Sequence, residues 1–113
     1  MSKVSNEELN QSAMKIIMLA GDCRNLLTEA VKSSMEDAPQ DRVDKMLKQA
    51  KEKIVEAHRI QTRIIQFTIE DEEMGATLLF SHAQDTLMTI YSELNLSGYL
   101  IDMYRKLSDK IDR

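Results

Sequence analysis

The chain contains one cysteine, one proline and three glycines among its 113 residues. Because Cys23 has no second cysteine to pair with, the chain forms no internal disulfide. Residues 1–10 lack the apolar run of a signal peptide. The longest apolar run, residues 16–20, is far shorter than the roughly 18–20 residues of a membrane-spanning helix. We therefore expect a soluble, cytoplasmic protein.

An excess of positive charge is also missing. Lysine and arginine total 15 against 19 aspartates and glutamates, which gives a net charge of -4, and the positive residues are scattered along the chain. Because nucleic-acid binding depends on clustered positive charge, we expect no nucleic-acid partner. A content of 42% hydrophobic and 30% charged residues is typical of a globular protein, and the length fits a single domain over residues 1–113.

The helical patterns are interrupted at two places. One lies around Pro39, and the other is the acidic segment 70–75, which contains Gly75. In the three segments that remain, apolar residues recur at steps of three and four, the spacing of amphipathic helices. The pattern predicts helices over about 6–34 and 41–67, and a third helix after the second break. No segment shows the alternation typical of a strand. The expected fold is all-α, an antiparallel three-helix bundle, with Ser5 and Glu8 spaced as a capping box at its start.

The third predicted helix carries two stripes of residues. The stripe expected to pack on the other helices consists of Leu79, Ala83, Leu87, Ile90, Leu94, Ile101, Tyr104 and Leu107. A second stripe mixes apolar and polar residues: Leu78, Ser81, Asp85, Met88, Ser92 and Asn95. Because three slender helices cannot bury apolar surface on two faces of one helix, self-association through the second stripe is one interpretation. The other is that this stripe faces water, and periodicity alone does not decide between them.

His82 and Asp85 are the residues of greatest chemical interest, three positions apart on one helical face. An imidazole that titrates near neutral pH can act as a base, a metal ligand or a phosphoryl acceptor. A buried carboxylate beside it needs a proton, a cation or a hydrogen-bond donor. A lone histidine is by default a structural hydrogen-bonding group, and we interpret His58 in that way or as a minor part of the wall of the site. Cys23, on the apolar face of the first helix, is expected to be an inert core residue.

Three motifs, one in each predicted helix, together resemble a known family. They are Ala20-Gly21-Asp22-Cys23-Arg24, Glu56-Ala57-His58-Arg59-Ile60-Gln61-Thr62 and Ser81-His82-Ala83-Gln84-Asp85-Thr86-Leu87-Met88-Thr89. In this order and at these separations they are similar to the lactose/cellobiose-family IIA component of the bacterial phosphoenolpyruvate-dependent sugar phosphotransferase system. The resemblance extends over about residues 7–106, and its most specific part is the run that begins at His82.

The resemblance implies a three-helix subunit that assembles into a homotrimer and acts as a phosphotransferase. In this family the histidine that matches His82 receives a phosphoryl group from the phosphocarrier protein HPr and passes it to a cysteine of the IIB component. The membrane is reached only indirectly, through the IIC component. The aspartate that matches Asp85 faces the trimer axis, where three copies hold one divalent cation. We expect Mg²⁺, because oxygen ligands with water completing the shell suit that ion.

One residue departs from the family pattern, since Thr86 stands where the family commonly has histidine. The Thr86 hydroxyl can donate a hydrogen bond but carries no positive charge. It lies four residues after His82 on the same face and is a candidate donor to a phosphoryl group on its own subunit. Gln84 points about 200° away from His82 and is a candidate donor to the histidine of a neighbouring subunit.

Other classes of function fit the sequence less well. The His-x-x-Lys-Gly pattern of two-component phosphotransfer domains is absent, because Asp85 and Thr86 occupy those positions. The Glu-x-x-His pairs of a di-iron bundle are absent as well. The remaining alternative is a non-enzymatic, oligomeric helical interaction module in which His82 and Asp85 are polar residues of a subunit interface.

Overall fold

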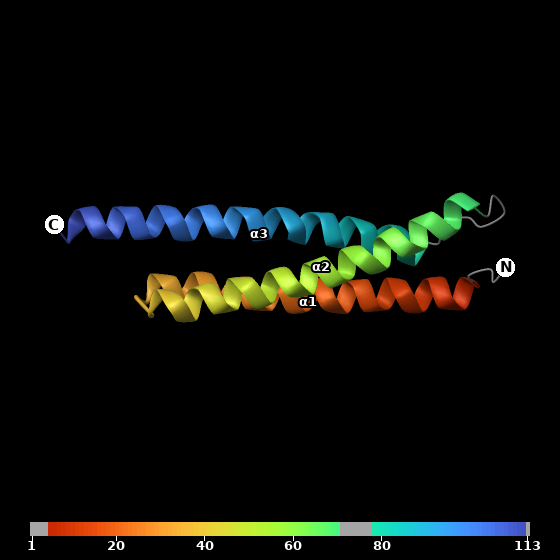
Figure 1. Cartoon of the computed structure of the whole chain (residues 1–113), viewed down its shortest axis with the longest axis horizontal. Coiled ribbons are helices and arrows are strands. Elements are labelled where there is room, and N and C mark those ends of the chain that lie inside the picture. The colour runs from red at the N-terminus through yellow and green to blue at the C-terminus, as the bar shows by residue number, and fades with distance from the viewer. Residues whose placement is uncertain (1–4, 71–77, 113) are drawn as a thin grey trace.

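The computed structural model describes residues 5–70 and 78–112 and contains three α-helices (Figure 1). They are α1 at Asn6–Met35, α2 at Gln40–Glu70 and α3 at Leu78–Ile111. These bounds confirm the predicted helices to within a few residues, and the described residues include no strand. Most of the second predicted break lies outside the described residues. None of the three helices is long and apolar enough to cross a membrane.

The start of α1 is fixed by the predicted capping box. The Ser5 hydroxyl accepts a hydrogen bond from the Glu8 N–H at 3.1 Å, and the Glu8 carboxylate accepts one from the Ser5 N–H at 3.2 Å. The first N–H groups of a helix have no hydrogen-bond partner inside the helix. Here the Ser5 hydroxyl is the partner of the Glu8 N–H, and the Glu8 carboxylate in return binds the backbone N–H of Ser5.

The turn between α1 and α2 is held by a tyrosine of α3. Asp37 in this turn has φ 61°, a left-handed conformation that aspartate adopts more readily than most residues. The Tyr104 hydroxyl lies 3.0 Å from Asp37 Oδ1 and 3.2 Å from the Met35 carbonyl oxygen, and its single O–H is shared between these two acceptors. The hydrogen bond to Asp37 raises the pKa of Tyr104, because ionisation would remove the donor. α2 begins directly after Pro39, at a place where the missing N–H costs no helical bond.

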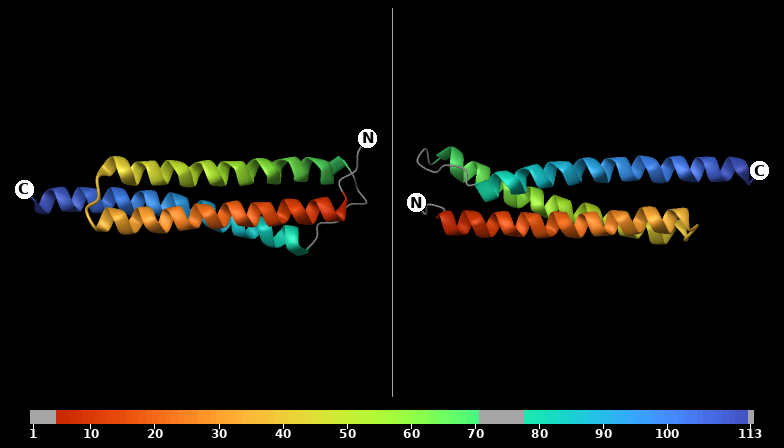
Figure 2. Two further views of the ribbon diagram at one scale, coloured as in Figure 1. Left: turned by 90° about the horizontal axis from the view of Figure 1, so that it is seen from below. Right: turned by 180° about the vertical axis from the view of Figure 1, so that it is seen from behind.

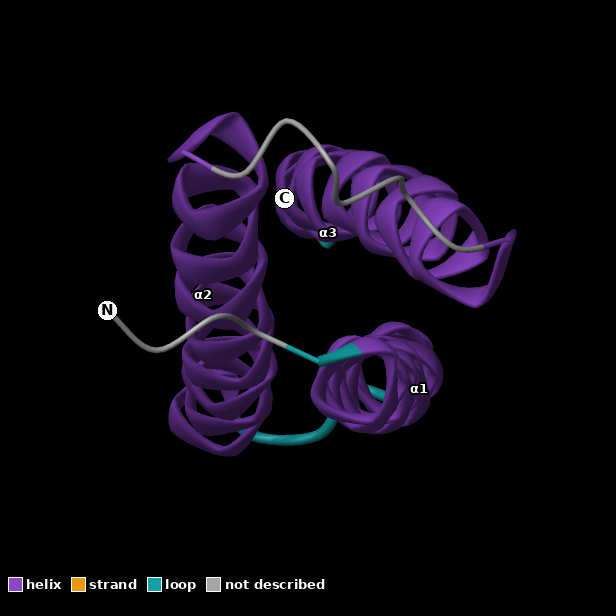
Figure 3. Cartoon of the chain, turned by 90° about the vertical axis from the view of Figure 1, so that its right-hand side faces the viewer, coloured by secondary structure: helices purple, strands orange, loops and turns teal. Residues whose placement is uncertain are grey.

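The three helices enclose one main core. α1 and α2 run antiparallel side by side, while α3 crosses them and packs mainly on α1 (Figure 2). The view along the bundle shows the helices around a common interior (Figure 3). The core consists of small and medium-sized apolar side chains from all three helices, among them Leu9, Ala13, Ile16, Ala20, Cys23, Ala50, Ile54, Ala57, Ile64, Phe80, Ala83, Leu87 and Ile90.

The C-terminal end of α3 extends past the turn between α1 and α2 (Figure 1). Ile101 is still buried, in a smaller cluster with Ala30 and Val43. Beyond it, Leu107 is 56% exposed and Ile111 is 82% exposed. The prediction that Leu107 packs against the other helices is therefore wrong, because α1 and α2 end before this part of α3. The resulting molecule is a rod of 63 × 20 × 17 Å.

Candidate functional site

His82 lies near the start of α3 and is exposed to solvent. His82, Thr86, Thr89 and Glu93 follow one another at steps of three and four and so share one face of the helix. Glu93 forms an ion pair with Arg24, which shows that this face borders α1. The His82 ring makes no hydrogen bond to any residue that the structure describes. Another protein can therefore approach the ring without breaking a hydrogen bond to the described residues.

The two threonines on this face bond to the backbone of their own helix. Thr86 Oγ1 donates to the His82 carbonyl at 2.8 Å, and Thr89 Oγ1 donates to the Asp85 carbonyl at 2.8 Å. Threonine in a helix commonly bonds to the carbonyl four residues earlier. The Thr86 hydroxyl must therefore leave the His82 carbonyl before it can donate to a phosphoryl group, and its supporting role stays a prediction.

Two further polar residues named from the sequence lie away from this face. Gln84 is half-buried, two residues after His82 and hence on a different side of α3. Its action on the histidine of another subunit stays a prediction. His58 is exposed on α2, and no hydrogen bond joins it to a described residue. Its expected structural hydrogen bond is therefore not formed within the described part of one chain.

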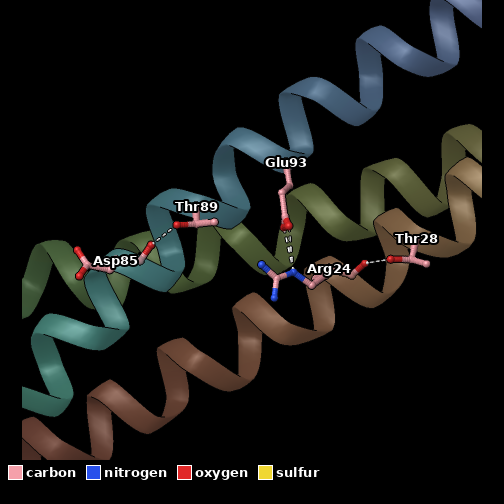
Figure 4. A network of polar contacts seen from close by, with 5 residues as sticks. All are labelled: Arg24, Thr28, Asp85, Thr89 and Glu93. Carbon is pink, nitrogen blue, oxygen red and sulfur yellow. Dashed lines mark hydrogen bonds and ion pairs between the residues drawn. The ribbon is translucent and has the colours of Figure 1, made fainter.

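Asp85 is exposed on α3, three residues after His82. Its main-chain carbonyl accepts the bond from Thr89 (Figure 4), but its carboxylate accepts no hydrogen bond from a described residue. No group of three or more histidine, cysteine, aspartate or glutamate side chains in the described segments of one chain has the arrangement of a metal site. Within the described residues of one chain, Asp85 therefore belongs to no cluster of metal ligands.

The second stripe predicted for α3 lies on the outside of the bundle. Leu78 is 89% exposed and Met88 is 57% exposed. The exposed apolar row continues toward the C-terminus beyond the predicted stripe. We call the whole row the outer stripe of α3: Leu78, Ser81, Asp85, Met88, Ser92, Asn95, Leu96, Tyr99 and Met103. Five of its nine members are apolar, and large exposed apolar patches are typical of interaction surfaces.

An ion pair joins α1 to α3 along the His82 face (Figure 4). Arg24 Nε donates to both carboxylate oxygens of Glu93, at 2.9 and 3.2 Å. Because the two side chains are 50% and 38% exposed, the pair contributes about 0.2–1 kcal/mol. Its geometric effect is to fix this face of α3 against α1. No spacing rule connects two residues so far apart in the chain, so the sequence did not reveal the pair.

Cys23 is buried in the core, as predicted. Burial, and to a smaller extent the negative charge of Glu93, raises the pKa of the thiol from 9.0 to about 11. A thiol with this pKa is almost entirely protonated at neutral pH and is a poor nucleophile.

This pKa predicts how Cys23 reacts with a thiol-specific reagent. At about pH 8 the thiolate fraction of the native protein should be about 100-fold lower than that of the unfolded chain, because the pKa differs by about two units. We expect slow labelling of the native protein, faster labelling as the pH approaches 11, and complete labelling in denaturant. Rapid, stoichiometric labelling of the native protein at pH 8 would contradict this account of the thiol.

Comparison with known families identifies the chain. The family model described as "PTS system, Lactose/Cellobiose specific IIA subunit" matches residues 11–105. The chain belongs to this family. It is a phosphotransferase component of a sugar phosphotransferase system (PTS), as the run beginning at His82 indicated. The matched residues reach into all three helices and include both His82 and Asp85.

Individual relatives agree with the family match. The chain is 34% identical over 106 residues to the lichenan-specific phosphotransferase enzyme IIA component of Bacillus subtilis, covering 93% of the chain and 94% of the relative. It is 32% identical over 101 residues to the N,N'-diacetylchitobiose-specific EIIA component of Escherichia coli, covering 89% and 86% respectively. This IIA sequence therefore matches PTS relatives over almost its whole length.

Solved structures share the fold. The crystal structure of the PTS cellobiose-specific enzyme IIA from Bacillus anthracis superposes with a TM-score of 0.83 at 32% identity, covering 94% of each chain. The solution structures of the IIA(chitobiose)–HPr complex of Escherichia coli give a TM-score of 0.80 at 30% identity, covering 89% of this chain and 97% of the other. The three-helix architecture is thus that of PTS IIA subunits.

Proposed function

We propose that His82 is the phosphoryl acceptor of this IIA component, that HPr is its donor and that the cognate IIB component receives the group. The observation that carries the proposal is an exposed imidazole, free of hydrogen bonds to the described residues, at the acceptor position of the family motif. A relative solved in complex with HPr supports HPr as the donor. We expect the reaction in the cytoplasm, with the membrane reached only through IIC.

The chemistry follows from the properties of imidazole. An uncharged ring nitrogen of His82 attacks the phosphorus, and a P–N bond forms as the bond from phosphorus to the donor breaks, with its electron pair leaving on the donor. Protonation makes the phosphorylated ring a good leaving group, so the phosphoryl group can pass on to the cysteine of IIB. The protein's part is to align the reacting atoms and to supply hydrogen-bond donors to the phosphoryl oxygens. Thr86, and Gln84 of a neighbouring subunit, are the candidate donors.

The outer stripe of α3 supports a homotrimer in which three copies of α3 meet on one axis. Its exposed leucines and methionines offer apolar surface for such packing. Three copies of Asp85 near the axis would repel one another unless a cation or protons lay between them. The exposed Asp85 carboxylate, which accepts no bond from the described residues, suits a divalent cation such as Mg²⁺. In this proposal the ion neutralises charge at the axis.

Because HPr and IIB must reach His82 in turn, we expect both to use one largely apolar surface around it. Met14 is 51% exposed, Met18 is 65% exposed and Leu78 is 89% exposed, and Leu79 is the fourth candidate. Amide chemical shifts recorded during titration with HPr and with IIB should change in overlapping sets that include these residues. Two separate surfaces would show that the partners do not share a site.

The proposal is tested by reconstituting the phosphoryl relay. Incubation with phosphoenolpyruvate, enzyme I and HPr should add one phosphoryl group per chain, stable in base and labile in acid, as expected for a phosphohistidine. Adding unphosphorylated IIB should then remove it. A non-enzymatic interaction module would stay unmodified, which would overturn the proposal.

A further inference from the structure

A second surface lies between α1 and α2, away from His82. It is a groove of about 680 Å³ whose described lining comes from these two helices alone. Lys15 of α1 lines this groove, whereas Arg24 of the same helix contacts Glu93 on the His82 face. Lys15 and Arg24 are nine positions apart, or about two and a half helical turns, so the two side chains point to opposite sides of α1. An occupant of the groove would therefore leave His82 accessible.

The rim of the groove carries unpaired positive charge. Lys15, Arg59 and Arg63 line it and are exposed, and none of them forms an ion pair within the described residues. Arg59 and Arg63 are four residues apart on α2, a spacing at which like charges destabilise a helix slightly. This local excess is notable in a chain whose net charge is -4.

Two carboxylates also line the groove, but they do not neutralise it. Glu8 is engaged in the capping box, where its carboxylate accepts the Ser5 N–H at 3.2 Å. Glu56 is the second, and it is not paired with either arginine. Both carboxylates keep their negative charge, so three cations and two carboxylates leave the lining with a net charge of +1, which favours an acidic occupant.

The floor of the groove is apolar. Ile60 and Phe67 are half-buried there and Ile64 is buried. A groove that runs between two adjacent helices has the shape that accepts a further helix by its apolar face, as in helix-in-groove recognition. We propose that this groove binds an acidic amphipathic helix of a partner protein, with apolar side chains on Ile60 and Phe67 and carboxylates beside Lys15, Arg59 and Arg63.

The test uses a synthetic amphipathic peptide of about four helical turns, with leucines on one face and glutamates flanking them. Titrated into the full ¹⁵N-labelled chain, it should shift amide signals in residues 8–15 and 56–67. The double variant Arg59→Glu, Arg63→Glu should weaken its binding about tenfold or more. The matched control, Lys48→Glu with Lys51→Glu, makes the same change in net charge at exposed α2 residues outside the groove and should leave binding unchanged.

Three further probes separate this proposal from simpler ones. A peptide with lysine in place of glutamate, a peptide with serine in place of leucine, and inorganic phosphate should each bind at least about tenfold more weakly than the acidic amphipathic peptide. Equal binding of any of them, shifts outside the groove, or unchanged binding to the double variant would overturn the proposal. Saturating peptide should leave phosphorylation by HPr intact, and a block of that transfer would show that the groove is not separate from the His82 site.

Discussion

His82→Ala is expected to lose phosphorylation by HPr completely. The substitution removes the only imidazole in the family's acceptor motif. The acid-labile P–N bond needs a ring nitrogen, and alanine provides none. Because the His82 ring is exposed and makes no hydrogen bond to the described residues, helicity and oligomeric state should not change. Phosphoryl incorporation, circular dichroism and sedimentation measure the three properties on one preparation.

His58→Ala is the matched control for this experiment. His58 is also exposed on a helix, so its replacement removes a similar surface imidazole outside the acceptor motif. The variant should accept one phosphoryl group per chain, as the wild type does. If His82→Ala were phosphorylated normally, or if His58→Ala were the inactive variant, the assignment of the acceptor would be wrong.

Removal of divalent cations at neutral pH is expected to weaken the proposed trimer. Two carboxylates about 4 Å apart repel by roughly 4 kcal/mol at an effective dielectric constant near 20, and three copies of Asp85 on the axis of the proposed trimer would form three such pairs. Asp85→Leu should make the trimer independent of metal, because apolar packing replaces the repulsion. Sedimentation of the wild type and of this variant, each with and without chelator, measures both effects.

Glu52→Leu provides a control for the added apolar surface. Glu52 is exposed on α2, away from the outer stripe of α3, and no hydrogen bond or ion pair joins it to a described residue, so its replacement should leave the dependence on metal unchanged. A wild-type protein that remains monomeric in excess Mg²⁺ would contradict this account of Asp85. A trimer lost only in Asp85→Leu would contradict it as well.

Local sequence signals predicted the helices well. The capping box at Ser5 and Glu8, the burial of Cys23 and the exposure of the second stripe on α3 each depend on spacings within one helix. Such spacings are set by 3.6 residues per turn whatever the other helices do. The same spacing predicted that His82 and Thr86 share one face of the helix. In the structure the Thr86 hydroxyl donates a hydrogen bond to the main-chain carbonyl of His82.

Features that depend on how the helices are arranged were not predictable. Leu107 keeps the inward spacing but is exposed, because α3 is longer than the two helices it packs against. Phe80 is buried although it was not assigned to the inward stripe, because the crossing of α3 over α1 and α2 decides which side faces the core. The contacts of Tyr104 with Asp37 and of Arg24 with Glu93 join residues far apart in the chain.

The central claim, that His82 carries the phosphoryl group, is tested most directly by mapping the group on the phosphorylated chain. The protein is phosphorylated through enzyme I and HPr, kept at alkaline pH to preserve a phosphohistidine, digested and sequenced by mass spectrometry. We expect a single phosphoryl group on the peptide that contains His82, and its loss on addition of IIB. A phosphoryl group on His58, or on a residue other than histidine, would contradict it.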